Sequence, residues 1–544
     1  MRFRARRLLR LAPVLVATVA FGLCIWAPGP VTVTSDEPNW LARSEQFRHA
    51  LAQGDLHDAN AILPATLIQH QTSPGVTTMW AGTIGHGLVR LGQRVGLVDE
   101  RPEGPRTEQV MLRAGRGVVS FFCAVALGLF MWVSSRLVGR RVALVAGALL
   151  ACEPFLIGHA GVLHTDALVT LWGATSIAAF ASALADRRWH RPSLVLSAVA
   201  AALACLTKVN ATVLIAGAVV VLLLASSLAR RARGGSPAPL RSRVAGIGAW
   251  SGIAAAVFVA LWPAMWVAPI RSLRQCLDAF GQAESTDRTY FRGVTTNHPG
   301  PAYYPVAIVM RATPWLVVLG LAGLVVMTTS ALTKRSGARA EAISIGALIV
   351  APVPYLAAIS LPAQRYDRYA LPVFPFMALA AGVAVVALAS ALRVQRGWLV
   401  PIGLAVLAVP LLLERTMAPY EISYVDPLIG QKRAQHWILL GWDEGIERLG
   451  SDIDRREHRR CDDIDVLVFN QALAIAVPCG RLDGAGRPRS ERRDFEYAIH
   501  YISQRQRGQF DNFYDPIERH GTLVDSVRIG GVDYADLWRV GRRR

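Results

Sequence analysis

Long apolar runs recur along most of this chain, separated by short polar or arginine-rich segments. A membrane-spanning helix needs about 20 apolar residues, with about 17 as the lower limit. Eleven runs are candidates, at 11–28, 117–134, 142–158, 167–185, 193–207, 209–228, 245–268, 306–330, 342–361, 370–392 and 398–413. This pattern predicts a mostly α-helical, polytopic membrane protein with about eleven transmembrane helices. The pair within 193–228 could instead form one re-entrant element, since its first member is short.

The polar segments between alternate runs carry Lys and Arg. Since cytoplasmic loops retain these residues, they predict a cytoplasmic N-terminus, with the first run as an uncleaved signal anchor. Five loops agree with this orientation. Their basic residues, loop by loop, are Arg136, Arg140 and Arg141; Arg187, Arg188 and Arg191; Arg230, Arg231, Arg233, Arg241 and Arg243; Lys334, Arg335 and Arg339; and Arg393 and Arg396. The same orientation places four segments outside the membrane: the first outer loop 29–116, the turn 159–166, the loop 269–305, and the chain after 414.

The chain from 415 onward changes character. Charged residues are frequent there, with 21 Lys and Arg against 21 Asp and Glu, and Asp465–Phe469 and Tyr497–Tyr501 have strand-like composition. We therefore expect two domains, a transmembrane domain over 1–414 and a small extracytoplasmic α/β domain over 415–544. Cys461 and Cys479 both lie in this second domain, where they could form a disulfide or be buried separately.

Composition supports a membrane protein. Hydrophobic residues make up 53% of the chain and charged residues only 18%, against about 25% charged in ordinary soluble domains. The net charge is +19, but the surplus lies in the clusters between apolar runs, which argues against a nucleic-acid partner. The abundance of Ala and Arg suits a bacterial plasma (inner) membrane.

Ionisable residues at the expected outer ends of the spans are candidates for function, because charge near the membrane is costly. Asp36 and Glu37 follow the first span, and His164 and Asp166 open the fourth. Carboxylates in these positions could act as bases or metal ligands. They could equally cap a helix or favour its dipole.

Cations gather on the same expected face. Lys208 is the only charged residue between Arg191 and Arg230, and Arg365 and Arg368 open the tenth span on the side where arginine is not expected. A phosphate would suit all three cations, although snorkelling of the lysine and pairing with Asp367 are alternatives. The segment His298-Pro-Gly-Pro-Ala-Tyr-Tyr304 predicts a fixed turn in an outer loop. No residue spacing points to a metal site.

Together these motifs resemble the GT-C integral-membrane glycosyltransferases. Asp36-Glu37, His164-Thr-Asp166 and Leu206-Thr-Lys208 are similar to motifs of glycosyltransferase family 39, which includes protein O-mannosyltransferases and lipid A aminoarabinose transferases. Arg365-Tyr-Asp-Arg-Tyr369 and the outer-loop tyrosines are further similarities. Segments 423–430 and 441–446 resemble stretches of bacterial members. The resemblance covers about 30–415 and extends weakly through the remainder.

The resemblance implies transfer of a sugar from a polyprenyl-phosphate donor to an acceptor hydroxyl on the outer face, with inversion at the anomeric carbon. Asp36 would be the base, and Asp166 would assist by orienting the acceptor or tuning Asp36. Glu37 would be a further catalytic residue. Lys208, Arg365 and Arg368 would hold the donor phosphate. Substrate binding would fall to His164, His298, Tyr303 and Tyr304.

The partners expected from this resemblance are membrane lipids, the lipid-linked donor, and a protein, lipid or cell-wall glycan as acceptor. No cofactor is required by the sequence, although a divalent cation could assist at the phosphate. A different class of protein, a transporter or lipid flippase, would use Asp36 and Asp166 to bind a coupling ion. A non-catalytic assembly subunit would need neither carboxylate.

Overall fold

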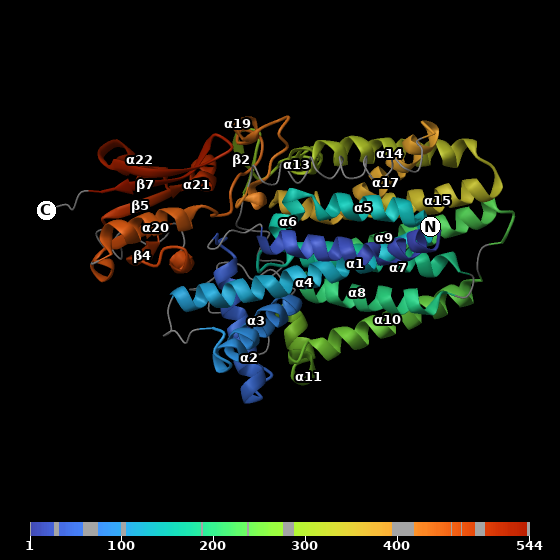
Figure 1. Cartoon of the computed structure of the whole chain (residues 1–544), viewed down its shortest axis with the longest axis horizontal. Coiled ribbons are helices and arrows are strands. Elements are labelled where there is room, and N and C mark those ends of the chain that lie inside the picture. Colours follow the sequence, from blue (N-terminus) through green and yellow to red (C-terminus); the bar gives the residue numbers. More distant parts are fainter. Residues whose placement is uncertain are drawn as a thin grey trace.

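The structure, a computed structural model, combines a long helical bundle with a C-terminal region that contains a β-sheet and lies at one end of the bundle (Figure 1). We call this end of the bundle the tail end and the opposite end the far end. The described residues are 2–26, 32–57, 74–98, 105–186, 189–236, 239–275, 288–393, 418–458, 460–468, 471–484 and 495–540.

The bundle is built from helices that run along its length. They are α1 (Arg2–Trp26), α4 (Pro105–Val138), α5 (Arg140–Ala151), α6 (Pro154–Ala160), α7 (Asp166–Ala185), α8 (Arg191–Thr207), α9 (Asn210–Ala232), α10 (Leu240–Leu261), α14 (Pro314–Thr333), α15 (Ser336–Val350), α16 (Val353–Ile359) and α17 (Phe374–Ala391). A 3-10 segment, η2 (Asp367–Val373), leads into α17.

Within the described residues, seven helices are long and apolar enough to cross a membrane, or eight if a bent pair forms one span. That pair is α5 and α6, which meet at 69°. Two shorter apolar helices, Pro13–Ile25 and Arg191–Thr207, match further predicted runs. The predicted 306–330 run is broken near Ala312, because Pro314 starts a new helix there. The eleventh run, 398–413, lies outside the described residues, so the count of eleven stays a prediction.

Helix α7 lies at the centre of the bundle. Its residues are apolar on all sides and nearly all are buried, as expected for a helix surrounded by other helices. It packs against α4, α8 and α9. Because Asp166 is its first residue, the centre of the bundle carries a carboxylate at the tail end.

Helices α8 and α9 form an antiparallel pair. His190, just before α8, contacts Arg136 near the end of α4 (Nε2 to Nη2, 2.9 Å), and Lys208, just after α8, contacts Asp166. Helix α8 therefore runs from the far end to the tail end, and α9 returns. Each of the two helices thus runs along the bundle from one end to the other. This agrees with two separate spans and differs from the single re-entrant element considered for 193–228.

Shorter elements cover the tail end. They are α2 (Glu37–Gln53), α3 (Val76–Arg94), α11 (Ala264–Val267), the hairpin of β1 (Thr289–Phe291) and β2 (Val294–Thr296), and α13 (Tyr303–Arg311). Helix α2 packs on α3, and α3 packs on α4. This packing places the start of α2 beside the start of α7.

The C-terminal region contains a five-stranded mixed sheet in the order β4-β3-β5-β7-β6. Its strands are β3 (Asp465–Val468), β4 (Arg481–Gly484), β5 (Tyr497–Tyr501), β6 (Thr522–Ile529) and β7 (Val532–Arg539). Strand β3 is parallel to β4 and β5, whereas β7 is antiparallel to β5 and β6. Both predicted strands are confirmed.

The C-terminal region also contains helices and 3-10 turns. They are η4 (Glu421–Ser423), α19 (Gln431–Ala434), α20 (Ile446–Glu457), η5 (Cys461–Asp463), η6 (Gln471–Ile475), α21 (Ile502–Arg507) and α22 (Asp511–His520). Leu467 and Ala498 pack with Tyr514 of α22, while Val466 belongs to the main core with Ile453 of α20. A disulfide joins Cys461 to Cys479, which resolves the two alternatives left open by the sequence.

Candidate active site

Five side chains that lie far apart in the sequence converge at the tail end of the bundle. They come from the start of α2, the turn before α7, the first residue of α7, the α8–α9 junction and η2. We call them the acid–base cluster: Asp36, His164, Asp166, Lys208 and Arg368. All five are among the residues predicted from the sequence.

Asp36 is the most accessible carboxylate of the cluster. It precedes α2 at the N-cap position, yet its side chain makes no capping hydrogen bond. Instead, its Oδ2 lies 3.4 Å from Nε2 of His164 and 3.8 Å from Nη2 of Arg368. The side chain is 38% exposed, whereas that of Asp166 is 3% exposed. Of the two carboxylates, Asp36 is therefore the one that a substrate can reach.

Asp166 is held by three cationic or imidazole groups. Nζ of Lys208 donates to its Oδ1 at 2.6 Å, Nδ1 of His164 lies 3.3 Å from its Oδ2, and Nε of Arg368 lies 3.3 Å from the same oxygen. Burial makes an unpaired charge very costly, so Asp166 fixes the positions of its partners. Asp166 is therefore the residue that holds these three side chains together.

The segment around Arg368 supplies aromatic rings to both cations. The guanidinium carbon of Arg368 lies 4.2 Å from the ring centre of Tyr366, and Nζ of Lys208 lies 4.4 Å from that of Tyr369. Asp367, expected as an alternative partner for the arginines of its own segment, accepts from Nε of Arg311 at 2.6 Å. The rings therefore orient Lys208 and Arg368 without neutralising them. Both cations can still pair with carboxylates or with a bound anion.

Trp442 brings the C-terminal region into the site. Its ring centre lies 4.2 Å from the guanidinium carbon of Arg368 and 4.7 Å from the imidazole of His164, at right angles to it. The Trp442 carbonyl also accepts from the backbone N–H of Ser35 at 3.3 Å. In the sequence, the 441–446 segment only resembled a stretch of bacterial family members. No local pattern predicted that its tryptophan reaches the cluster.

Glu37 has a different environment from its neighbour Asp36. It is fully buried, and its carboxylate accepts from Nε of Arg116 at 2.7 Å and from the backbone N–H of Leu163 at 2.8 Å. It also accepts from the N–H of Thr34 at 3.0 Å. These bonds connect the start of α2 to α4 and to the turn that carries His164. The geometry therefore differs from the catalytic role expected for Glu37, because its oxygens are occupied by structural partners.

Arg365 likewise departs from expectation. Its guanidinium donates to three backbone carbonyls, those of Pro362 at 3.0 Å and of Gly300 and Ser360. This side chain links the surrounding loops, and none of its contacts in the described part of the chain involves the cluster. The phosphate contact stays a prediction for both Arg365 and Arg368, and of the two only Arg368 lies in the cluster.

The predicted outer-loop residues lie outside the cluster as well. Tyr303 and Tyr304 are each 1% exposed and pack with Phe291 and Ala370. The Tyr303 hydroxyl donates to the Arg365 carbonyl at 3.2 Å. His298 is exposed, and its N–H donates to Oγ1 of Thr296. None of the contacts seen in the described ranges joins these three residues to Asp36 or Asp166.

The electrostatics favour an ionised Asp36. Burial opposes its ionisation, but the hydrogen bond and charge of His164 and the charge of Arg368 hold the pKa of Asp36 below its usual value. Burial also opposes charge on His164, yet Asp166 and Asp36 raise the pKa of the imidazole above its usual value. The cluster thus pairs two carboxylates with three groups that carry or accept positive charge.

The chain is similar to known proteins in a segment of its sequence and in its fold. Residues 114–245 match the family model described as dolichyl-phosphate-mannose-protein mannosyltransferase. The crystal structure of ArnT from Cupriavidus metallidurans in the apo state is similar over 98% of both chains, at 16% identity and a TM-score of 0.51. The chain has the GT-C fold.

More distant structural matches include the Archaeoglobus fulgidus oligosaccharyltransferase, at 12% identity over 91% of this chain and 70% of that chain, with a TM-score of 0.47. Arabinofuranosyltransferase AftD from Mycobacteria matches over 99% of this chain and 40% of that chain, at 15% identity and a TM-score of 0.38. No curated protein matches the chain by sequence.

The family match and the fold together indicate a glycosyltransferase similar to family 39. The matched segment 114–245 includes most of α4, all of α7, and the α8–α9 junction. Three of the five cluster residues therefore lie inside it: His164, Asp166 and Lys208. Asp36 and Arg368 come from outside the matched segment, and the GT-C bundle brings them to the same point.

Proposed function

We propose that this protein transfers a sugar from a polyprenyl-phosphate donor to an acceptor hydroxyl, with inversion at the anomeric carbon. The observation that carries the proposal is the convergence of an accessible carboxylate, Asp36, with two fixed cations, Lys208 and Arg368, at one end of a membrane bundle. A group-transfer site needs a proton acceptor and a cradle for the leaving phosphate, and this cluster offers both.

Asp36 acts as the general base in this proposal. The acceptor oxygen attacks the anomeric carbon, the bond from that carbon to the phosphate oxygen breaks, and the hydroxyl proton moves to the Asp36 carboxylate. A carboxylate of ordinary or lowered pKa is a weak base, but it needs only to accept the proton as the new bond forms. Its 38% exposure gives the acceptor access.

Lys208 and Arg368 stabilise the leaving group. The donor phosphate gains negative charge as its bond to the sugar breaks, and fixed cations lower the energy of that state most. Asp166 and the rings of Tyr366 and Tyr369 hold the two cations in place before the donor arrives. A divalent cation could add to this stabilisation, but the proposed step does not pass through one.

We further propose that the tail end faces the outside of a bacterial plasma membrane and that the far end faces the cytoplasm. The far end carries Arg136 of α4, Arg230 and Arg231 of α9 and Arg339 of α15, in keeping with the positive-inside rule. Residues 1–414 would then form the transmembrane domain, and 415–544 an outer domain that contributes Trp442 to the site. The acceptor, whether protein, lipid or glycan, would approach between the cluster and this outer domain.

The proposal is tested with purified protein in lipid bilayers and a panel of radiolabelled polyprenyl-phosphate sugars. We expect one donor to be consumed, with labelled sugar transferred and free polyprenyl phosphate released in equal amounts. A transporter would move its substrate across the bilayer without releasing polyprenyl phosphate. Movement without release would therefore contradict the proposed function.

A further inference from the structure

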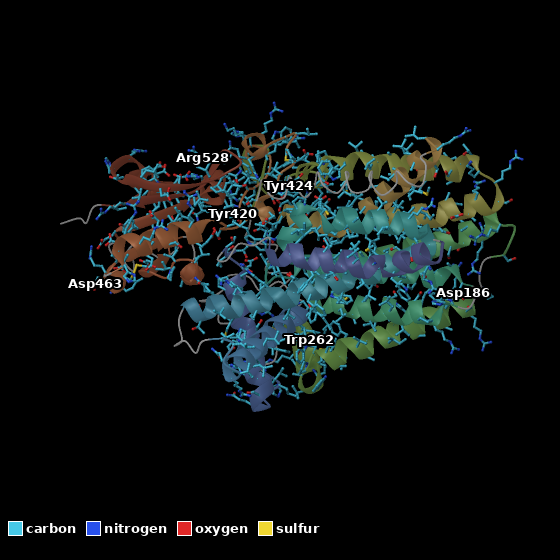
Figure 2. The ribbon with its side chains drawn as sticks, in the orientation of Figure 1. Asp186, Trp262, Tyr420, Tyr424, Asp463 and Arg528 are labelled. Atoms are coloured by element: carbon cyan, nitrogen blue, oxygen red, sulfur yellow. A yellow bond between two sulfur atoms is a disulfide. The ribbon has the colours of Figure 1, made fainter. Side chains whose placement is uncertain are left out.

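A hollow lies at the far end of the bundle, remote from the acid–base cluster. It has a volume of about 630 Å³ and is lined by the ends of α4, α7 and α9 and the start of α15. On α4, Arg116 belongs to the tail end and Arg136 to this hollow. The 20 residues between them correspond to about 30 Å of helix. Figure 2 shows Asp186, which follows α7, at the opposite end of the bundle from Tyr420 and Tyr424.

The walls of this far-end cavity combine charge with apolar surface. Among the residues that the structure describes, three arginines line it, Arg136, Arg230 and Arg233, against one carboxylate, Glu341. Leu222 and Ile345 are among the apolar residues of its wall. The lining therefore has a net positive charge beside a hydrocarbon-like surface. A soluble anion would use only the first of these features, whereas a lipid with a phosphate headgroup would use both.

The position of the cavity also fits a lipid. It opens where the helices of the bundle end, at the depth expected for headgroups if the bundle spans a bilayer. Its volume lies within the range of about 300–1,000 Å³ that is typical of small-molecule sites. Basic pockets between transmembrane helices on the cytoplasmic side are suited to anionic lipid headgroups. Guanidinium groups favour phosphate because they can donate two parallel hydrogen bonds to it.

We propose that the far-end cavity binds an anionic phospholipid, with its phosphate at Arg136 and Arg233 and the upper part of an acyl chain against Leu222 and Ile345. This site is separate from the proposed transfer site, and its occupancy does not require the transfer reaction. It would tie α4, α9 and α15 together at the end of the bundle that the C-terminal region does not cover.

The proposal is tested by native mass spectrometry of the full chain in detergent, titrated with dioleoyl phosphatidylglycerol. The expected result is one saturable phosphatidylglycerol adduct that dioleoyl phosphatidylcholine, with the same acyl chains, does not form at equal concentration. The R136Q/R233Q variant should bind phosphatidylglycerol roughly thirtyfold more weakly, since two basic contacts near the membrane surface are lost. The R140Q/R141Q variant removes two exposed far-end arginines that do not line the cavity, and its affinity should be unchanged.

Arg136 also contacts His190, so R136Q/R233Q could disturb the fold. The E341Q variant guards against this, because removal of the carboxylate that lines the cavity among the described residues should strengthen phosphatidylglycerol binding severalfold, a gain that damage to the fold would not produce. Equal binding of phosphatidylcholine would overturn the proposal, as would an unchanged affinity in both R136Q/R233Q and E341Q. Displacement of phosphatidylglycerol by millimolar inorganic phosphate would show that a soluble anion is the ligand and would also overturn it.

Discussion

Two arginines three residues apart differ in what surrounds them. Arg368 contacts both carboxylates of the cluster and is stacked by aromatic rings, whereas Arg365 is bound to backbone carbonyls. The sequence presents both as candidate phosphate ligands, because each stands beside a tyrosine at the same expected membrane face. Only the three-dimensional course of the loops separates their roles.

This difference predicts different outcomes for a matched pair of variants. Arg368→Gln should lower kcat/KM for sugar transfer about a hundredfold in protein that remains folded, as for loss of one transition-state donor. Arg365→Gln should instead lower Tm, since hydrogen bonds from a charged donor contribute about 1.5–3 kcal/mol. Steady-state transfer assays and thermal unfolding of both variants check this. Equal losses of activity at unchanged Tm would contradict the assignment.

Asp443 makes stability depend on pH. It is buried next to Trp442, and burial together with the charge of Glu444 raises the pKa of its carboxyl to about 7. The folded protein then holds a proton that the unfolded chain releases near pH 4. Stability from this group is therefore present below about pH 4 and is lost as the pH rises to about 7.

We expect Asp443→Asn to raise the Tm at pH 8 and to flatten the fall in Tm between pH 5 and pH 7. One unit of pKa difference corresponds to about 1.4 kcal/mol, so the gain at pH 8 should be at least of that order. Thermal unfolding of the full chain across this pH range measures it. Asp515→Asn, at an exposed position, serves as the control, and an identical effect of both substitutions would refute the role of Asp443.

At the scale of elements, α2 is positioned by a buried ion pair. Glu37 and Arg116 link α2 to α4, and the bond from Leu163 N–H to Glu37 extends this link to the turn before α7. Asp36 and His164 thus lie on segments fixed by the same carboxylate. Adjacent acids in a sequence cannot reveal such a division of roles, because the partner of Glu37 lies 79 residues away.

Glu37→Gln leaves the Arg116 charge buried without a counterion. Breaking one side of a buried pair costs about 3–5 kcal/mol, so we expect a large fall in Tm and loss of transfer activity together. Asp55→Asn, at an exposed position just after the same helix, is a control for which little loss of activity is expected. Unchanged Tm in Glu37→Gln would show that the ion pair does not hold α2.

The sequence positions of the described helices were predictable wherever a long apolar run ended in arginine or a turn, whereas the count of eleven spans stays a prediction. The positions at which the helices bend or break were less predictable. The bend between α5 and α6 places Glu153 against Thr313 of another segment (Oε2 to Oγ1, 2.7 Å), and no local pattern in the 142–158 run requires it. Tertiary partners decide where an apolar run bends, and these are not visible in one sequence.

At the scale of the whole molecule, the C-terminal region completes the site. All five cluster residues were predictable because charge is conspicuous in apolar surroundings. Trp442 was not, because a tryptophan in a mixed-composition region is unremarkable until the region docks on the bundle. Docking places its ring against Arg368 and His164, about 75 and 280 residues away in the sequence.

Trp442→Ala should therefore reduce transfer about tenfold while the protein remains folded, since a partly desolvated cation–π contact contributes about 1–2 kcal/mol. Trp442→Phe should retain most of the activity. Trp437→Ala removes a half-exposed tryptophan of the same region that packs on Phe291 and not on the cluster, and should have little effect. Equal loss in Trp437→Ala and Trp442→Ala would mean that the tryptophan acts only through the stability of the region.

The central claim is that Asp36 accepts the acceptor's proton during transfer. The most direct test compares Asp36→Asn with Asp55→Asn, an exposed carboxamide substitution at the other end of α2, in bilayers containing the donor that wild type consumes. The account predicts a loss of at least a hundredfold in kcat for Asp36→Asn, with an unchanged Tm, unchanged donor affinity and full activity of Asp55→Asn. Transfer by Asp36→Asn at the wild-type rate would contradict it.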